Sequence, residues 1–336
     1  MKKTIIFGLG ALLVIAAAIW WYIHSTSSKF NFTSPLLEVT QKPLEKYSFE
    51  NLRTAQIKSS EIKLEKILAE EESYTSHLFS YQVDGLPAGQ AGKKVTGQIN
   101  IPKAKAPKDG YPTILMIRGF IDPATYKTGD GTRKAAAVFA QNGFITIAPD
   151  MLGYGESDPP DLNTITARVI RPYEVLVLLN SLSRLPTTDY RNLGLWAHSN
   201  GGQIALSILE ITGKDIPTTL WAPVSKPFPY SILYYTDEYE DYGKAIRKVI
   251  ANFETDYDAD KYSIHGYYDW IQAPIQIHQG TADDAIPLEW TNDLVKALKE
   301  KDKQVTYYTY PGTDHDMRPA WNNVIQRDIA FFRKHL

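Results

Sequence analysis

A serine stands at an abrupt change in the sequence, where an apolar run gives way to small residues and then to a helical pattern. Residues 193–202 read Leu-Gly-Leu-Trp-Ala-His-Ser-Asn-Gly-Gly, and apolar residues then recur at helical spacing. This pattern predicts a strand, a sharp turn and a helix, with the hydroxyl of Ser199 exposed above a sheet. Such a serine is a candidate nucleophile for acyl transfer. The alternative is an ordinary strand-to-helix connection.

The small neighbours of this serine have a steric reason, because only small side chains let the backbones of the strand and the helix pass closely. The usual motif is G-x-S-x-G, and Ala197 replaces its first glycine here. Alanine is the next smallest residue, so the steric argument tolerates the change. The N–H group of Asn200 opens the helix, and we expect it to bind a developing oxyanion.

Two later loops carry candidate partners for the serine. Residues 280–287 read Gly-Thr-Ala-Asp-Asp-Ala-Ile-Pro and follow one predicted strand, and residues 310–315 read Tyr-Pro-Gly-Thr-Asp-His and follow the next. An acid and a histidine after successive strands, in the chain order Ser, Asp, His, are typical of a catalytic triad. The pattern offers Asp283 and Asp284 as the acid and His315 as the base.

These three motifs together resemble the catalytic domain of the prolyl oligopeptidase family and its dienelactone-hydrolase-like relatives, over residues 74–336. The resemblance implies that Asp283 is the acid rather than Asp284. It also implies His315 as the base and the N–H of Phe120 as the second oxyanion donor. The implied activity is cleavage of peptide bonds by a serine hydrolase, and no cofactor or metal is required.

The chain departs from the family pattern beside the second oxyanion donor. Relatives commonly carry histidine where Arg118 stands, and some members use a tyrosine hydroxyl that has no counterpart here. We expect Arg118 to pair with a carboxylate such as Asp122. A second histidine, His198, is expected to pack against the sheet rather than act as a base.

The elements that must position these residues alternate between strands and helices. Residues 74–83 and 94–101 predict a hairpin, and later apolar segments alternate with helical segments of 10 to 20 residues. This alternation favours an α/β architecture with a mostly parallel, doubly wound sheet, and the resemblance implies the α/β-hydrolase fold. The predicted catalytic domain therefore spans residues 74–336.

One connection is too long for a simple loop and predicts a small cap inserted over the triad. Residues 223–270, called the cap below, hold nine of the 21 tyrosines. Loops after parallel strands open on the same sheet edge as Ser199. We therefore expect cap aromatics such as Tyr234, Tyr235 and Trp270 to select substrates.

The N-terminal residues 1–24 predict a membrane anchor. Two lysines precede the uncharged stretch 4–23, which closes on Trp-Trp-Tyr before its last residue and reaches about 30 Å as a helix. This places the catalytic domain outside the cytoplasm. The alternative is a secreted protein, because Ala16 and Ala18 supply a signal-peptide cleavage site. Residues 25–73 are polar and are interpreted as a tether and lead-in segment.

Composition limits the remaining functions. A net charge of −2 without a basic, aromatic-rich cluster argues against a nucleic-acid partner, and the absence of cysteine excludes disulfides and thiolate chemistry. Full-length oligopeptidases carry a β-propeller, which the residues between anchor and hydrolase are too few to build. An esterase acting on small or polymer-linked esters is therefore a serious alternative, and a non-catalytic binding protein is a third. The oligomeric state is left open.

Overall fold

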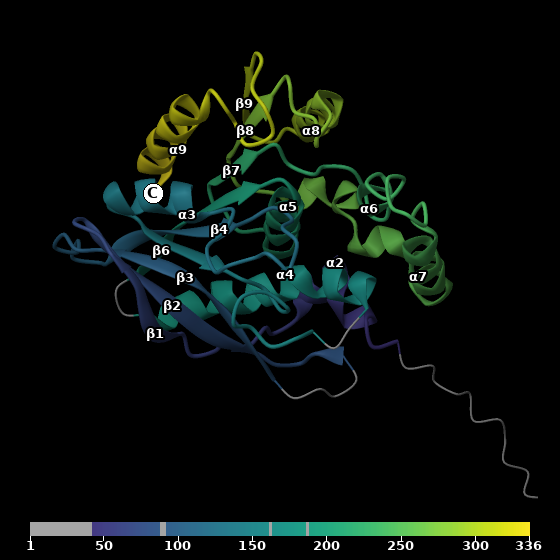
Figure 1. The fold of residues 1–336 in the computed structure, drawn as a ribbon, viewed down its shortest axis with the longest axis horizontal. Coiled ribbons are helices and arrows are strands. Elements are labelled where there is room, and N and C mark those ends of the chain that lie inside the picture. Colours follow the sequence, from purple (N-terminus) through teal and green to yellow (C-terminus); the bar gives the residue numbers. More distant parts are fainter. Residues whose placement is uncertain (1–41, 88–91, 161–162, 186–187) are drawn as a thin grey trace, which may run out of the picture. The chain divides into compact units, whose positions relative to one another are not determined.

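The sheet that carries the candidate residues has nine strands in the computed structural model, which describes residues 42–87, 92–160, 163–185 and 188–336 (Figure 1). In chain order they are β1 (Lys63–Glu70), β2 (Tyr74–Val83), β3 (Lys93–Pro102), β4 (Tyr111–Ile117), β5 (Ile145–Pro149), β6 (Thr188–His198), β7 (Thr218–Trp221), β8 (Ile275–Gly280) and β9 (Val305–Tyr310).

The strand order is β1-β2-β3-β5-β4-β6-β7-β8-β9. The first three strands pair antiparallel, β3 pairs antiparallel with β5, and all pairs from β5 to β9 are parallel. The predicted hairpin is confirmed, because Tyr74 pairs with Pro102 and Val83 with Lys93. The carboxyl ends of β6, β8 and β9 therefore meet at one edge of the sheet, as a mostly parallel architecture requires.

Helices cover both faces of this sheet, and further helices belong to the cap. The helices are α2 (Phe49–Thr54), α3 (Arg133–Gln141), α4 (Thr164–Ser181), α5 (Asn200–Thr212), α6 (Tyr230–Leu233), α7 (Lys244–Asp256), α8 (Leu288–Glu300) and α9 (Trp321–His335). The short 3₁₀ turns are η1 (Glu45–Tyr47), η3 (Leu182–Arg184), η4 (Ala259–Tyr262), η5 (Ile264–Gly266) and η6 (Tyr268–Trp270). In Figure 1, α3 and α9 lie on one side of the sheet and α4 and α5 on the other. The predicted doubly wound arrangement is confirmed.

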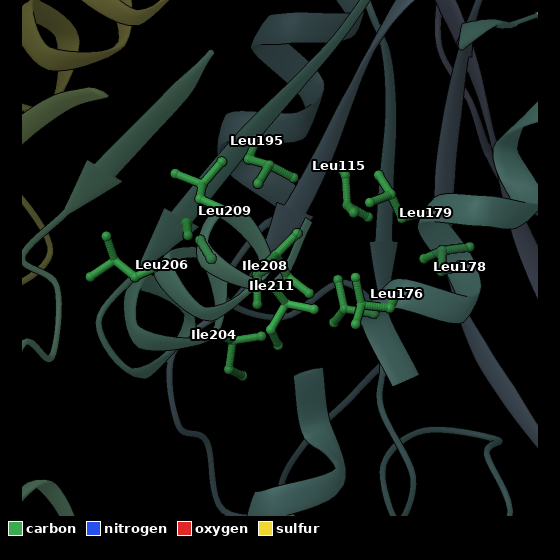
Figure 2. Close-up of a cluster of buried hydrophobic side chains, with 14 of the residues drawn as sticks. Leu115, Leu176, Leu178, Leu179, Leu195, Ile204, Leu206, Ile208, Leu209 and Ile211 are labelled. Carbon is green, nitrogen blue, oxygen red and sulfur yellow. The ribbon is translucent and has the colours of Figure 1, made fainter. Parts of the chain in front are cut away.

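The larger core fixes α5, the helix that follows the candidate serine. Figure 2 shows leucines of β4 and β6 facing apolar side chains of α4 and α5. Leu115, Leu195 and Ile208 are completely buried, and Leu176 is nearly so. Truncating one such side chain to alanine costs about 2–5 kcal/mol, so the first turn of α5 has little freedom to move relative to the sheet.

The compact unit begins earlier than residue 74, the predicted start of the catalytic domain. Residues Lys42–Leu336 form one unit, and β1 pairs with β2 as the edge strand of the same sheet. Nearly all β1 side chains are exposed, and many carry charge. Edge strands are commonly protected by such charges, and this removes the alternating apolar pattern by which a strand is recognised. For this reason β1 was not predicted from the sequence, and its residues were interpreted as part of the polar tether and lead-in segment.

The predicted membrane anchor, residues 1–24, and the first part of the tether lie outside the described residues. Within 42–336, among the residues that the structure describes, no helix is long and apolar enough to cross a bilayer. The predicted cap follows β7 and contains α6, α7 and the turns η4 to η6.

Candidate active site

Ser199 occupies a strained turn between β6 and α5. Its backbone has φ 55° and ψ −123°, a region that residues with a Cβ rarely adopt. The close approach of neighbouring backbone and side chains requires glycine at the two positions after Asn200. A Cβ on Gly201 would lie 2.1 Å from the carbonyl oxygen of Ile117, and one on Gly202 would lie 2.5 Å from the Cβ of Pro223. The predicted strand, turn and helix are thus confirmed, and the turn holds the serine at the carboxyl edge of the sheet.

Asp283 and His315 are brought together by the loops after β8 and β9. The Nδ1 atom of His315 lies 2.9 Å from Oδ2 and 3.0 Å from Oδ1 of Asp283. The carboxylate also accepts the N–H groups of Ala285 and Ile286, at 2.9 and 2.8 Å, and the side-chain amide of Gln279 at 2.9 Å. These contacts lock the orientation of the acid and, through it, that of the imidazole.

The charge state of Asp283 follows from two opposed influences. Burial is the largest and acts to raise its pKa, because the side chain is fully enclosed. Together, the hydrogen bonds from His315 and from the N–H of Ile286 outweigh the effect of burial, so the pKa of Asp283 lies below its ordinary value. Asp283 is therefore an anion at neutral pH, suited to stabilising a positive imidazole.

The neighbouring acid has a different environment. Asp284 is exposed, and the carboxylate beside His315 belongs to Asp283. The orientation leaves Nε2 of His315 as the nitrogen available to a substrate or a nucleophile. Within the described residues, Ser199 Oγ makes no hydrogen bond. Catalytic hydrogen bonds are often long without substrate and tighten only in the reacting complex.

His198 connects the serine turn to the histidine loop. It precedes Ser199, and its Nε2 lies 3.0 Å from the carbonyl oxygen of His315. The two imidazole rings are 4.6 Å apart between centroids. Burial, followed by repulsion from His315, lowers the pKa of His198 to about 4. His198 is therefore neutral at physiological pH, and its ring packs beside the loop that carries the candidate base.

The two backbone N–H groups predicted as oxyanion donors lie at the serine turn and on the segment beside it. Asn200 is the first residue of α5, and the first N–H groups of a helix have no intrahelical acceptor. The N–H of Phe120 likewise has no acceptor among the described residues, and its side chain is 71% exposed. Gly119 brings this segment to the serine, because a Cβ there would lie 2.9 Å from the Cβ of Ser199.

The expected pairing of Arg118 with Asp122 is wrong. The Arg118 side chain is buried, and its guanidinium lies 4.4 Å from the ring centroid of Tyr126 and 4.0 Å from that of Tyr154. Its Nη1 atom donates to the carbonyl oxygen of Gly119 at 2.8 Å. A planar cation stacks well on aromatic faces, so Arg118 fixes the backbone at Gly119, next to the predicted oxyanion donor Phe120. Asp122 instead accepts a backbone N–H within its own turn.

Two of the three cap aromatics lie over the acid loop. The ring of Tyr234 is 4.6 Å from that of Trp290, at the start of α8. The hydroxyl of Tyr235 donates to the carbonyl oxygen of Ala285 at 3.2 Å, two residues after Asp283. The first part of the cap therefore contacts the loop that positions the acid.

The third cap aromatic, Trp270, is in the wrong place for substrate selection. Its ring lies 4.5 Å from the guanidinium of Arg53, which donates to the carbonyl oxygen of Glu210 at 2.8 Å. Glu210 is in the last turn of α5, about 15 Å along the helix from Ser199. The turn η6 contacts α5 there, and the half-buried Trp270 packs against the core.

Two features of the structure had no signal in the sequence. His278 lies inside β8 and pairs with Asp328 of α9, at 2.9 Å between Nε2 and Oδ1. A separate arginine, Arg168 of α4, lies beside the first turn of α5. The partners of both residues come from distant segments, so only helix packing brings them together.

Comparison with known proteins bears on the family and the fold. The sequence profile of the prolyl oligopeptidase family matches residues 131–336. No curated protein matches the chain in sequence. Among solved structures, a Mycobacterium tuberculosis puromycin-hydrolyzing peptidase is 18% identical with a TM-score of 0.60, and the match covers 80% of this chain and 40% of that one.

Two further structures show the same fold. Porphyromonas gingivalis dipeptidyl peptidase 4 is 17% identical with a TM-score of 0.54, over 85% of this chain and 37% of that one. Acetyl xylan esterase from Paenibacillus sp. R4 is 14% identical with a TM-score of 0.66, over 86% of this chain and 92% of that one. The chain thus spans about two fifths of the length of the two peptidases.

Proposed function

Because the chain belongs to the prolyl oligopeptidase family and is a serine hydrolase, we propose that it cleaves peptide bonds through an acyl-enzyme formed on Ser199. The observation that carries this proposal is the contact between His315 Nδ1 and Asp283, made beside a serine in a strained strand-to-helix turn. Together the three residues have the types and connections of a Ser-His-Asp triad.

The chemistry follows from the free atoms of the site. Ser199 Oγ attacks the substrate carbonyl while Nε2 of His315 takes its proton, and Asp283 stabilises the imidazolium that forms. The N–H groups of Asn200 and Phe120 donate to the developing oxyanion. Collapse of the tetrahedral intermediate transfers the proton from His315 to the leaving amine. Water activated by His315 then releases the acyl group from Ser199.

Cleavage of esters is the second candidate, and a specific observation favours it. The match to the acetyl xylan esterase covers 92% of that chain, whereas the matches to the two peptidases cover 40% and 37% of theirs. Esters and amides react through the same triad, and an ester has the better leaving group. A carboxylesterase acting on small or polymer-linked esters therefore fits the same catalytic residues.

The test compares labelling and turnover in the same preparation. We expect a fluorophosphonate probe to label the wild-type protein and Ser183→Ala, which changes an exposed serine, but not Ser199→Ala. Alanine has the same Cβ as serine, so Ser199→Ala should fold normally and lose about 10⁶-fold in kcat. Peptide amides and p-nitrophenyl esters assayed side by side distinguish the two candidate activities. Labelling of Ser199→Ala at the wild-type rate would exclude the proposed nucleophile.

A further inference from the structure

Arg168 of α4 is a cation without an anionic partner. Its Nη2 atom donates to the side-chain oxygen of Gln203 and lies 3.5 Å from Ser231 Oγ, and both partners are neutral. In the described part of the chain, no carboxylate lies within ion-pair distance of Arg168. One turn later on α4, Arg171 contacts Glu174 at 3.1 Å. Two arginines on one helix thus differ in whether the protein supplies a counter-charge.

The Arg168 side chain opens onto a small cavity. The cavity has a volume of about 40 Å³, and its lining includes the buried rings of Phe49, Phe228 and Tyr262 as well as the paired Arg171. About 10–15 Å³ of such space is enough for one water molecule, so the cavity suits a small planar group and excludes a large side chain. A charge enclosed by apolar walls interacts strongly with an opposite charge placed beside it.

The cavity adjoins the candidate nucleophile. Asn200, the residue after Ser199, lines it, and Gln203 lines it one helical turn later. The side-chain amide of Asn200 makes no hydrogen bond within the described residues, so its donor is available to a ligand in this space. The distance from the serine to the mouth of the cavity is therefore of the order of one helical turn, about 5.4 Å.

The position of α4 assigns the cavity to the acyl side of the substrate. His315 and Asp283 follow β9 and β8, which lie on one side of β6 in the sheet. α4 connects β5, which lies on the other side of β6, to β6 itself, and it contacts α5, β2 and the cap helix α7. His315 must protonate the leaving group, so the leaving group lies toward β8 and β9. The acyl group then extends toward α4 and Arg168.

The charge of Arg168 persists in this setting. Burial lowers the pKa of Arg168 to about 10, Tyr235 acts to raise it and Arg171 to lower it, so the guanidinium stays protonated at neutral pH. A half-buried cation with only neutral partners has lost part of its hydration, and an anion supplied by a ligand would relieve that cost. The planar guanidinium matches the two oxygens of a carboxylate.

We propose that the pocket formed by Arg168, Asn200 and Gln203 binds a carboxylate carried on the acyl part of the substrate. The proposal rests on the proposed serine hydrolase function and narrows it to acyl groups that end in an acid. Succinyl-, glutaryl- or adipyl-type esters and peptides with an acidic residue on the acyl side belong to this class.

The kinetic test uses matched pairs of activated esters. The 4-nitrophenyl monoesters of glutarate and adipate are compared with their methyl-capped forms, which have the same chain and no charge. We expect the wild-type protein to prefer the acids in kcat/KM by tenfold or more. Arg168→Gln should lower that preference on the order of 10- to 100-fold, as expected for a charge-assisted hydrogen bond. Arg247→Gln changes an exposed cap arginine paired with Asp237 and should keep the preference.

A leaving-group control fixes the side of the site. An ester of 3-hydroxy-4-nitrobenzoate carries its carboxylate on the leaving group, and we expect Arg168→Gln to leave its rate relative to the 2-nitrophenyl ester unchanged. The proposal is overturned if the wild-type protein does not prefer the acids, or if the preference survives Arg168→Gln. It is also overturned if the protein prefers a carboxylate only when the leaving group carries it. Equal loss with acid and methyl-capped esters would also overturn it, because Arg168 would then be structural.

A binding measurement separates this proposal from the catalytic one. Ser199→Ala cannot turn over substrate, and glutarate should still raise its thermal unfolding midpoint relative to chloride at equal ionic strength. The double variant Ser199→Ala/Arg168→Gln should lose that shift. A shift that persists in the double variant, or is absent from both proteins, contradicts the carboxylate site. Either result leaves the probe-labelling test of Ser199 unaffected.

Discussion

The protein contains two histidine–aspartate pairs with the same separation and different surroundings. His315 Nδ1 and His278 Nε2 each lie 2.9 Å from an aspartate oxygen, of Asp283 and Asp328 respectively. The His315 side chain is 21% exposed, whereas both members of the second pair are completely buried. The first pair stands at the carboxyl edge of the sheet beside Ser199, and the second joins β8 to α9 within the core.

The second ring nitrogen explains the difference in chemistry. Nδ1 of His278 lies 2.7 Å from the hydroxyl of Tyr310, so both of its nitrogens are engaged. The indole of Trp221 donates to the other oxygen of Asp328 at 2.7 Å. Within the described residues, Nε2 of His315 has no partner. A histidine–aspartate contact thus becomes a general base only where the second nitrogen is open to substrate, and elsewhere it joins core elements.

Between the two histidine–aspartate pairs, the largest expected effect on turnover comes from removing the charge of Asp283. Asp283→Asn should lower kcat about 10⁴-fold, because an amide in this position favours the wrong imidazole tautomer. Asp284→Asn is the matched control and should stay within about twofold, since its side chain is exposed. Turnover of one activated ester by both variants measures the ranking. Equal losses, or a larger loss in Asp284→Asn, would assign the acid to Asp284.

Breaking the second pair should affect stability instead of turnover. Asp328→Ala leaves a buried imidazole and the indole of Trp221 without their acceptor, and loss of one partner of such a pair costs about 3–5 kcal/mol of unfolding free energy. Urea denaturation measures this loss, and Asp328→Asn, which keeps the shape, should lose less. The probe should label the folded variant at about the wild-type rate. A large loss of labelling with unchanged stability would instead give this pair a role in catalysis.

The smallest expected effect concerns how many titrating groups shape the acid side of the pH–activity profile. His198 has a pKa of about 4, lowered from 6.5, so it is already neutral across the range in which an ordinary histidine titrates. Activity should therefore fall with decreasing pH as a single-proton limb, with a slope of 1 in log kcat/KM against pH above about pH 5.

The same shift has a consequence for stability. The unfolded chain binds a proton at His198 more readily than the folded chain does, so this residue lowers stability as pH falls from about 6.5 to about 4. His198→Asn should flatten that part of the stability profile and keep the single-proton activity limb. A two-proton limb that becomes single in His198→Asn would show that His198 also titrates during catalysis.

Local sequence was sufficient for most of the elements and for proposing the candidate triad. The turn at Ser199 needs small residues at fixed offsets, and this requirement is visible within ten residues of sequence. The strands after which Asp283 and His315 stand are short apolar runs, and parallel strands bring their carboxyl ends to one edge. Strand β1 was missed because its exposed charges erase the alternation that marks a strand.

Tertiary packing alone determined which side chains meet across the layers. Asp328 reaches His278 only because α9 lies against β8, Arg118 is enclosed by tyrosines of two separate loops, and the cap returns Trp270 to the far end of α5. Within α4, Glu174 pairs with Arg171 at i,i+3, whereas the partners of Arg168, Gln203 and Ser231, come from α5 and α6. Sequence periodicity reports the face that a helix buries, whereas the partner of a charge depends on how neighbouring helices pack over the sheet.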